Sequence, residues 1–209
     1  MSNKGMYAMT TFQKGYQSNE MTANVPMQSS QLMKLFEDEL RDIYWVEKAL
    51  LHATPKMIKN ATSQELIETL TQLVVEIENQ INRVEMVFKF IKKRPSVKRC
   101  LAMEGQLKEV GDMMASCDPG AMCDAGIISA GRKVEHYEIA AYETLIGFAE
   151  SLGHEDVMEL FEVTLAELEA SVEKFAGVSD STILVQENAE EADEEMEEEY
   201  DQSYHLNLI

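Results

Sequence analysis

Glu138 lies in the middle of a long apolar segment, at a position that a helix would turn toward a protein core. With about 100° of rotation per residue, a helix over residues 125–152 places Ile127, Val134 and Leu145 on one stripe with Glu138. An ionised carboxylate in a core is costly unless it is paired, neutralised or bound to a metal ion. The sequence therefore predicts a partner for Glu138 elsewhere in the chain.

The same arrangement recurs in two matched halves of the chain. Glu47 is the centre of an earlier apolar stripe, and Glu76 follows it after 29 residues, the interval that also separates Glu138 from Glu167. Glu76 and Glu167 lie at the edge of the apolar stripe of their own helices, and they are called the shoulder glutamates below. Carboxylates that project inward from four facing helices form an oxygen-rich cage of the kind that binds two iron or manganese ions. These four glutamates are therefore predicted metal ligands.

Three points leave other interpretations open. A single glutamate on an apolar face is more often an edge residue bonded to a lysine. Glu135, about 60° from Glu138 around the helix, is close enough to bridge metal ions but is also well placed for a surface pair with Lys133 or Arg132. The Glu-x-x-His pair that is common in di-iron bundles is absent, and Gln80 and Ser171 occupy the inward positions where second ligands would stand.

Five helices must position these residues, and capping and breaking residues predict their ends. The helices are expected from Ser29 or Ser30 to Pro55, from Ser63 to Lys93, from Leu101 to Ala115, from Asp118-Pro119 to Gly153, and from Glu155 to Ala176 before Gly177. Pro55 should kink or end the first helix, and Thr62-x-x-Glu65 should cap the second. Four helices are long enough for an all-α four-helix bundle, with the short third helix packed across it as a crossover.

The charge and the cysteines limit the possible partners and compartments. The chain holds 38 Asp and Glu against 18 Lys and Arg, a formal net charge of −20, which argues against nucleic acid or an anionic membrane as partner. No run reaches the ~18 apolar residues of a membrane span, and no signal peptide is evident at the start. Cys100, Cys117 and Cys123 are odd in number and lack a Cys-x-x-Cys spacing, which predicts reduced thiols. We therefore expect a soluble, cytoplasmic protein.

One helical domain is expected between two tails. Residues 1–28 are polar and show no helical or strand period, so they are predicted to form a flexible arm. Residues 29–177 contain the bundle. Residues 178–209 are strongly acidic, with no Lys or Arg after Lys174, so like-charge repulsion should keep this tail extended and disordered.

Three stretches resemble the YciE/YciF-type proteins of the ferritin-like superfamily, a bacterial stress-associated family. They read LFEDELRDIYWVEKALL, CLAMEG and DAGIISAGRKVEHYEIAAYETL, and the similarity runs from about Leu32 to Phe175. The resemblance implies a ferritin-like four-helix bundle, a homodimer and a di-metal site. The acidic positions of the family that this chain keeps are Glu47, Glu76, Glu135, Glu138 and Glu167. It departs from the family at Val75, where the family has a second glutamate, and at Leu168, within a family run of glutamates.

Three functions are consistent with these patterns. The leading interpretation is a di-metal carboxylate protein, with di-iron or manganese as cofactor, that oxidises Fe(II) or reduces peroxide during stress, as a ferroxidase or peroxidase would. The alternative is a non-catalytic, stress-related structural or interaction bundle with a degenerate metal site, which the missing ligands favour. A third is a helical scaffold that docks partners through the acidic tail. The first two differ in whether the carboxylates converge. If one or more of them points to solvent or meets Arg or Lys instead, the degenerate-site alternative is favoured.

Overall fold

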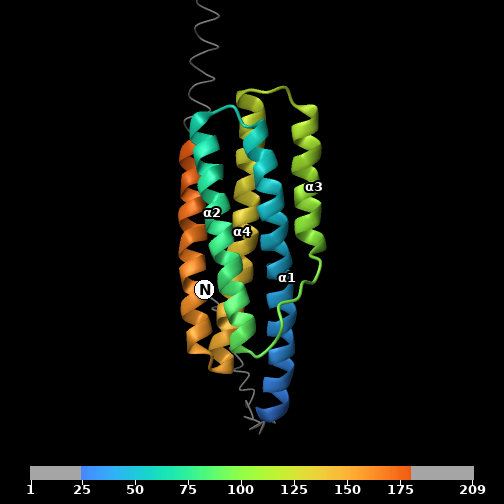
Figure 1. The fold of residues 1–209 in the computed structure, drawn as a ribbon, viewed down its shortest axis with the longest axis vertical. Coiled ribbons are helices and arrows are strands. Elements are labelled where there is room, and N and C mark those ends of the chain that lie inside the picture. The colour runs from blue at the N-terminus through green and yellow to red at the C-terminus, as the bar shows by residue number, and fades with distance from the viewer. Residues whose placement is uncertain (1–24, 180–209) are drawn as a thin grey trace, which may run out of the picture.

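The computed structural model describes the backbone of residues 25–179 and the side chains of residues 29–179. Its helices are α1 (Val25–Asn60), α2 (Gln64–Phe90), α3 (Leu101–Ser116), α4 (Ala121–Leu152) and a last helix over residues 155–179, drawn in orange without a label in Figure 1. No strand occurs within these described residues. The all-α prediction is therefore confirmed.

Four of the helices form a bundle, and α3 lies beside it (Figure 1). The turn at residues 61–63 reverses the chain, so α1 and α2 are antiparallel. α2 and α4 run in the same direction, so the chain must return along the bundle between them, and residues 91–100 together with α3 provide this crossover. The predicted bundle with a crossover helix is confirmed. However, α3 packs lengthwise against α4 and α1 rather than across the bundle.

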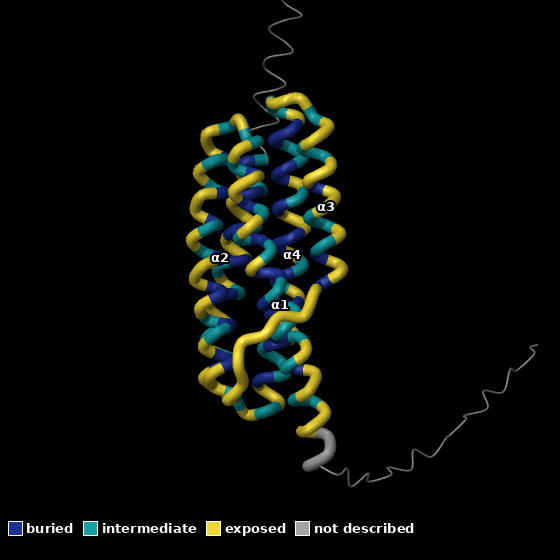
Figure 2. Tube along the Cα trace, turned by 45° about the vertical axis from the view of Figure 1, so that its right-hand side comes forward, coloured by how far each residue is buried: buried dark blue, intermediate teal, exposed yellow. Residues whose placement is uncertain are grey.

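The buried face of each bundle helix follows the apolar stripe predicted from the sequence (Figure 2). On α2 the stripe that begins at Leu66 and ends at Val87 is buried, including the polar Gln80. On the last helix Phe161 and Phe175 are completely buried. The stripes could be read in advance because the 3.6-residue period persists over the whole of each long helix.

Most helix ends differ from the prediction by a few residues. α1 begins at Val25 and continues past Pro55 to Asn60, because proline removes only one hydrogen bond and Met57, beyond it, is buried in the core. α2 ends at Phe90, before Lys92, whose φ of 57° turns the chain out of the helix. The last helix continues through Gly177 to residue 179. Residues 1–24 of the expected arm and 180–209 of the expected tail lie outside the described residues.

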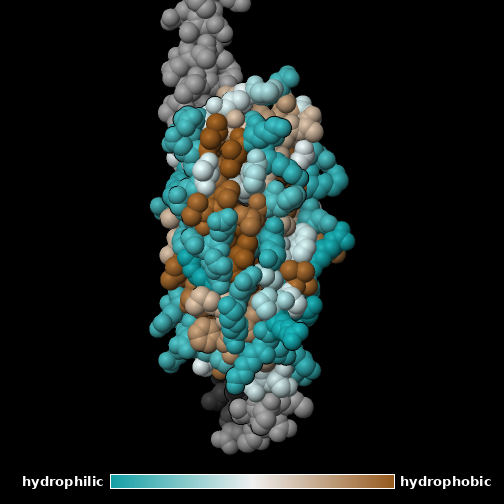
Figure 3. Space-filling model, in the orientation of Figure 1, coloured by the Kyte–Doolittle hydropathy of each residue, from teal (hydrophilic) through white to brown (hydrophobic). Residues whose placement is uncertain are grey.

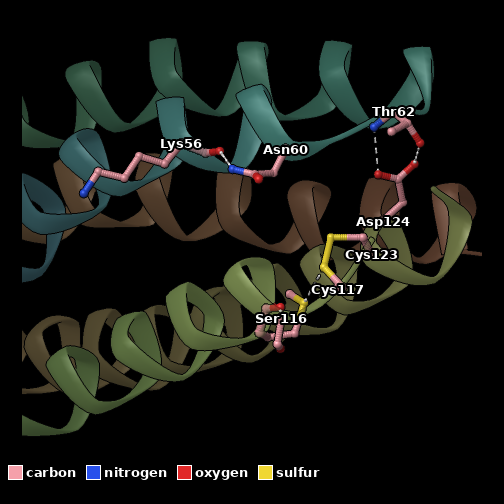
Figure 4. The surroundings of a disulfide bond; sticks show 8 residues. Lys56, Asn60, Thr62, Ser116, Cys117, Cys123 and Asp124 are labelled. Carbon is pink, nitrogen blue, oxygen red and sulfur yellow. Dashed lines mark hydrogen bonds between the residues drawn. A yellow bond between two sulfur atoms is a disulfide. The ribbon is translucent and has the colours of Figure 1, made fainter. Parts of the chain in front are cut away.

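The N-terminus of α2 is capped by a side chain from α4. Ser63, not Thr62, is the N-cap residue, and its hydroxyl accepts a hydrogen bond from the Leu66 N–H. Asp124 Oδ1 accepts the Thr62 N–H at 2.8 Å, and its Oδ2 accepts the Thr62 hydroxyl at 2.7 Å (Figure 4). Oδ2 also accepts the Ser63 N–H at 2.8 Å. The predicted Thr62 capping box is therefore wrong, and a buried carboxylate ties the α1–α2 turn to the start of α4.

Beside Asp124, a disulfide joins Cys117 and Cys123 across the connection between α3 and α4 (Figure 4). Their Cα atoms are 5.6 Å apart, because Gly120, with a φ of 149°, reverses the chain just before α4. The predicted start of α4 at Asp118-Pro119 is two to three residues too early for the same reason. The prediction of reduced thiols is wrong for this pair, while Cys100 is free and buried. The cysteine argument for a reducing compartment therefore fails, and the cytoplasmic location stays a prediction.

The surface in Figure 3 is mostly hydrophilic, with a broken band of hydrophobic side chains along its length. Among the described helices, none combines the length and the apolar composition that crossing a membrane requires.

Val75, Met86 and Phe90 are exposed hydrophobic residues on α2, and their spacing places them on one face of that helix. The homodimer implied by the family resemblance stays a prediction.

Replacing Gly131 with alanine is expected to destabilise the fold by about 1–3 kcal/mol, because the new methyl group would overpack a filled core. A Cβ atom at Gly131 would lie 2.7 Å from Cζ of Phe175, the buried ring that packs on α4 from the last helix. Gly147→Ala is the matched control on the same helix, since nothing lies within 4 Å of its Cβ position and alanine is the better helix former. Urea denaturation should show opposite shifts for the two variants, and equal shifts would contradict the close packing.

Candidate metal centre

Three of the predicted ligands are buried on α1 and α4 and interact with one another through their charges. Glu47 of α1 and Glu135 and Glu138 of α4 are all buried. The charge of Glu135 acts on both Glu47 and Glu138, and the charge of Glu47 acts on Glu138. Glu135 does not form the alternative surface pair with Lys133, which instead lies 3.6 Å from Glu109. These three carboxylates are called the Glu47–Glu135–Glu138 cluster below.

The cluster has few hydrogen-bond donors. The buried Tyr142 hydroxyl donates to Oε1 of Glu47. Within the part of the chain that the structure describes, Oε2 of Glu47, both oxygens of Glu135 and Oε1 of Glu138 are buried without a hydrogen-bond partner. The Ser171 hydroxyl is near enough to favour the charged form of Glu135, although it forms no well-aligned hydrogen bond. Buried carboxylate oxygens in this state need either a proton or a cation.

Burial raises the pKa of all three carboxyl groups. Desolvation raises the pKa of Glu47 to about 8, against the opposing effect of the hydrogen bond from Tyr142. Desolvation likewise raises the pKa of Glu135 to about 8. The pKa of Glu138 rises well above its usual range because the group is desolvated and faces the other two carboxylates. Without a cation the cluster therefore holds protons near neutral pH, and a metal ion must displace them to bind.

The two shoulder glutamates meet cations instead. Both terminal nitrogens of Arg83 on α2 pair with the carboxylate of Glu167 on the last helix. Lys174 of the last helix lies 3.1 Å from Oε1 of Glu76 on α2. The structure therefore brings Glu47, Glu135 and Glu138 together and holds Glu76 and Glu167 in ion pairs between α2 and the last helix. As metal ligands, all five stay predictions.

The reasoning from sequence missed Arg83 and Lys174. Each stands seven residues after a shoulder glutamate, Arg83 after Glu76 and Lys174 after Glu167, so the repeat that relates the two halves of the chain includes a cation. Seven residues are about two helical turns, which places both members on one face of their helix. Because α2 and the last helix are antiparallel, each cation meets the glutamate of the other helix.

Gln80 and Tyr44, two other residues near the predicted site, differ in whether their polar atoms have hydrogen-bond partners. Gln80 of α2 is buried, and neither polar atom of its amide has a hydrogen-bond partner among residues 29–179. Tyr44, three residues before Glu47, donates to Glu85 of α2 at 2.6 Å and so serves the α1–α2 contact. Gln80 therefore remains available to a ligand in the core, and Tyr44 does not.

The chemistry of the cluster fits a hard divalent cation. Its donors are all oxygen, its carboxyl groups become negatively charged when their protons are displaced, and its unpartnered oxygens are what a cation would satisfy. In the described residues, no three His, Cys, Asp or Glu side chains already form a group that could hold an ion. Glu47, Glu135 and Glu138 would therefore have to rotate about their side-chain bonds to share one. Iron and manganese both accept such ligands.

Comparison with known proteins identifies the family of this chain. The family described as a domain of unknown function, DUF892, matches residues 31–199. The chain belongs to the DUF892 family. Protein YciF of Escherichia coli (strain K12) is 35% identical to this DUF892 chain over 145 residues, which are 66% of this chain and 87% of YciF.

Two solved structures resemble this DUF892 protein. The crystal structure of the E. coli stress protein YciF gives a TM-score of 0.70 at 31% identity, over 73% of this chain and 96% of that one. YcfI of Rhodopseudomonas palustris, described as a proposed structural protein, gives a TM-score of 0.67 at 35% identity, over 77% of this chain and 98% of that one. The predicted YciF-type family and helical bundle are thereby confirmed.

Proposed function

We propose that this DUF892 protein is a ferritin-like carboxylate protein that binds iron or manganese inside its helical bundle. The observation that carries the proposal is the set of buried, unpartnered oxygens of Glu47, Glu135 and Glu138 within the described chain. A divalent cation would supply the charge that they lack. When bound, iron or manganese would supply one-electron redox chemistry, suited to oxidation of Fe(II) or reduction of peroxide in a stress response of the kind named for YciF.

The side chains of this protein have distinct roles in the proposal. Glu47, Glu135 and Glu138 bind the ion, and the apolar stripes around them exclude water. Tyr142 donates a hydrogen bond to Glu47 and so fixes the orientation of that carboxylate. Burial, with the charge of Glu47 close by, raises the pKa of Tyr142, so the phenol keeps its proton.

Metal-depleted protein is expected to take up Mn(II), or Fe(II) under anaerobic conditions, in a calorimetric titration. Glu138→Gln should weaken the affinity at least about tenfold, because it removes a charged ligand from the cluster without changing its size. Glu143→Gln is the matched control, since Glu143 lies on the same helix and is exposed. Equal uptake by wild type and Glu138→Gln would contradict the assigned site.

A second candidate function is a non-catalytic structural or interaction bundle with a degenerate metal site. The Arg83–Glu167 and Lys174–Glu76 pairs favour it, because they satisfy two of the family's acidic positions without a metal ion. The description of YcfI as a proposed structural protein supports the same function. Failure of well-folded wild-type protein to bind Mn(II) or Fe(II) would select this candidate.

A further inference from the structure

We infer that Arg83 and Lys174 act as built-in counter-ions that restrict the centre of this bundle to one metal ion, held by the Glu47–Glu135–Glu138 cluster. The inference rests on the proposed metal binding, since it concerns how many ions the same centre takes. A two-ion centre needs carboxylates on all four bundle helices to be available. In this chain Glu76 of α2 and Glu167 of the last helix are already paired with cations.

The ion pair of Arg83 with Glu167 is the stronger of the two pairs. The two terminal nitrogens of Arg83 each bond one oxygen of Glu167, and Nη1 also donates to the buried Thr164 hydroxyl at 3.0 Å. Only 16% of the Arg83 side chain is exposed, so this bidentate pair is largely sheltered from water. The charge of Arg83 also acts on Glu47. A fixed positive charge therefore lies within reach of both carboxylates that a second ion on this side would need.

Lys174 has the equivalent position in the other half of the repeat. Its Nζ atom lies 3.1 Å from Glu76, and its charge also acts on Glu135. The Lys174 side chain is 46% exposed, so solvent screens this pair more than the Arg83 pair. Lysine also makes single rather than bidentate contacts with a carboxylate. Lys174 therefore contributes to the restriction less strongly than Arg83 does.

The charge balance leads to the same number of ions. The cluster offers three carboxylates, because Glu76 and Glu167 are neutralised by their own partners. One divalent ion compensates most of the negative charge of these three carboxylates. Two divalent ions would leave a net positive charge in a buried centre, which is unfavourable. Removal of both cations would release two more carboxylates, and their charge would compensate a second divalent ion.

The test counts the Mn(II) ions bound per chain, by elemental analysis after gel filtration of protein loaded in excess Mn(II). Wild type should hold one ion, and the double variant Arg83→Gln/Lys174→Gln should hold two. The double variant Arg99→Gln/Lys108→Gln is the matched control, because it removes two cations from the exposed pairs Arg99–Glu104 and Lys108–Asp112. This control should keep one ion.

A further variant separates the release of a carboxylate from a change in structure. Arg83→Gln/Glu167→Gln removes both charges of the pair, frees no carboxylate, and should keep one ion. Circular dichroism checks that each variant is folded, and Arg83→Gln alone replaces the first double variant if that one does not fold. Two ions in wild type, or only one after the cations are removed, would overturn the inference and leave the proposed function intact. No ion in any folded protein would overturn both.

Discussion

Replacing Asp124 with alanine is expected to lower the free energy of unfolding by about 3–5 kcal/mol, the largest loss from any single change considered for this fold. The carboxylate is buried and accepts three hydrogen bonds, from the Thr62 N–H, the Thr62 hydroxyl and the Ser63 N–H. Alanine would leave these donors without an acceptor at the beginning of α2. Thermal unfolding followed by circular dichroism should show a fall of roughly 2–4 °C in the melting temperature per kcal/mol.

Two further variants sharpen this prediction. Asp112→Ala removes an exposed aspartate that pairs with Lys108 on α3, and should change the stability by less than about 0.5 kcal/mol. Asp124→Asn keeps one oxygen acceptor and the shape of the side chain, so its loss should be intermediate. A loss of less than about 1 kcal/mol in Asp124→Ala would show that the α1–α2 turn does not depend on the contact with α4.

Metal-free protein is expected to become less stable as the pH rises from about 4.5 to about 8. The folded pKa of Glu47 and of Glu135 is about 8, above the ordinary 4.5, so in this range the folded state keeps protons that the unfolded state has lost. The stabilisation is therefore fully present below about pH 4.5 and disappears as the pH passes through about 8. Because one pKa unit corresponds to about 1.4 kcal/mol, the expected loss is a few kcal/mol.

Urea denaturation at a series of pH values measures this slope. Glu138→Gln should flatten it, because desolvation and the charges of Glu47 and Glu135 raise the pKa of Glu138 itself, so the variant lacks one of the carboxyl groups that cause the slope. Glu143→Gln should retain the slope of the wild type, because Glu143 is exposed on α4 and lies outside the cluster. Mn(II) should oppose the loss at high pH if it replaces the protons of the cluster. A flat profile in the wild type would contradict the burial of ionisable groups in this core.

Much of the fold could be predicted from the sequence, because long helices repeat their buried positions many times. The α2 stripe from Leu66 to Val87 is an example, since several turns indicate the same face. Helix ends depend on single contacts with other parts of the chain, which periodicity does not contain. Thr62 illustrates this limit, because its partner Asp124 lies 62 residues away in the sequence. The disulfide between Cys117 and Cys123 depends in the same way on the turn between two helices.

The candidate site was predictable only in part, for a related reason. Glu47 and Glu138 stand at the centres of apolar stripes, and this position alone indicated their burial. Glu135 lies on the flank of its helix, where periodicity allows either a buried or a surface contact, and the packing of the bundle decides between them. The Arg83 and Lys174 pairs join two helices whose relative alignment is not contained in either stripe.

The same two ion pairs also determine how α2 and the last helix line up. Apolar stripes repeat every three or four residues, so they would tolerate a slip of one turn, about 5.4 Å, between the helices. Such a slip would separate Arg83 from Glu167 and also Lys174 from Glu76. It would leave four charged side chains without their partners at the partly buried contact between the two helices. A parallel alignment would set acid against acid and base against base. The two pairs therefore fix the register between α2 and the last helix. They favour one direction and one axial position of the last helix over the other alignments that the hydrophobic core alone would accept.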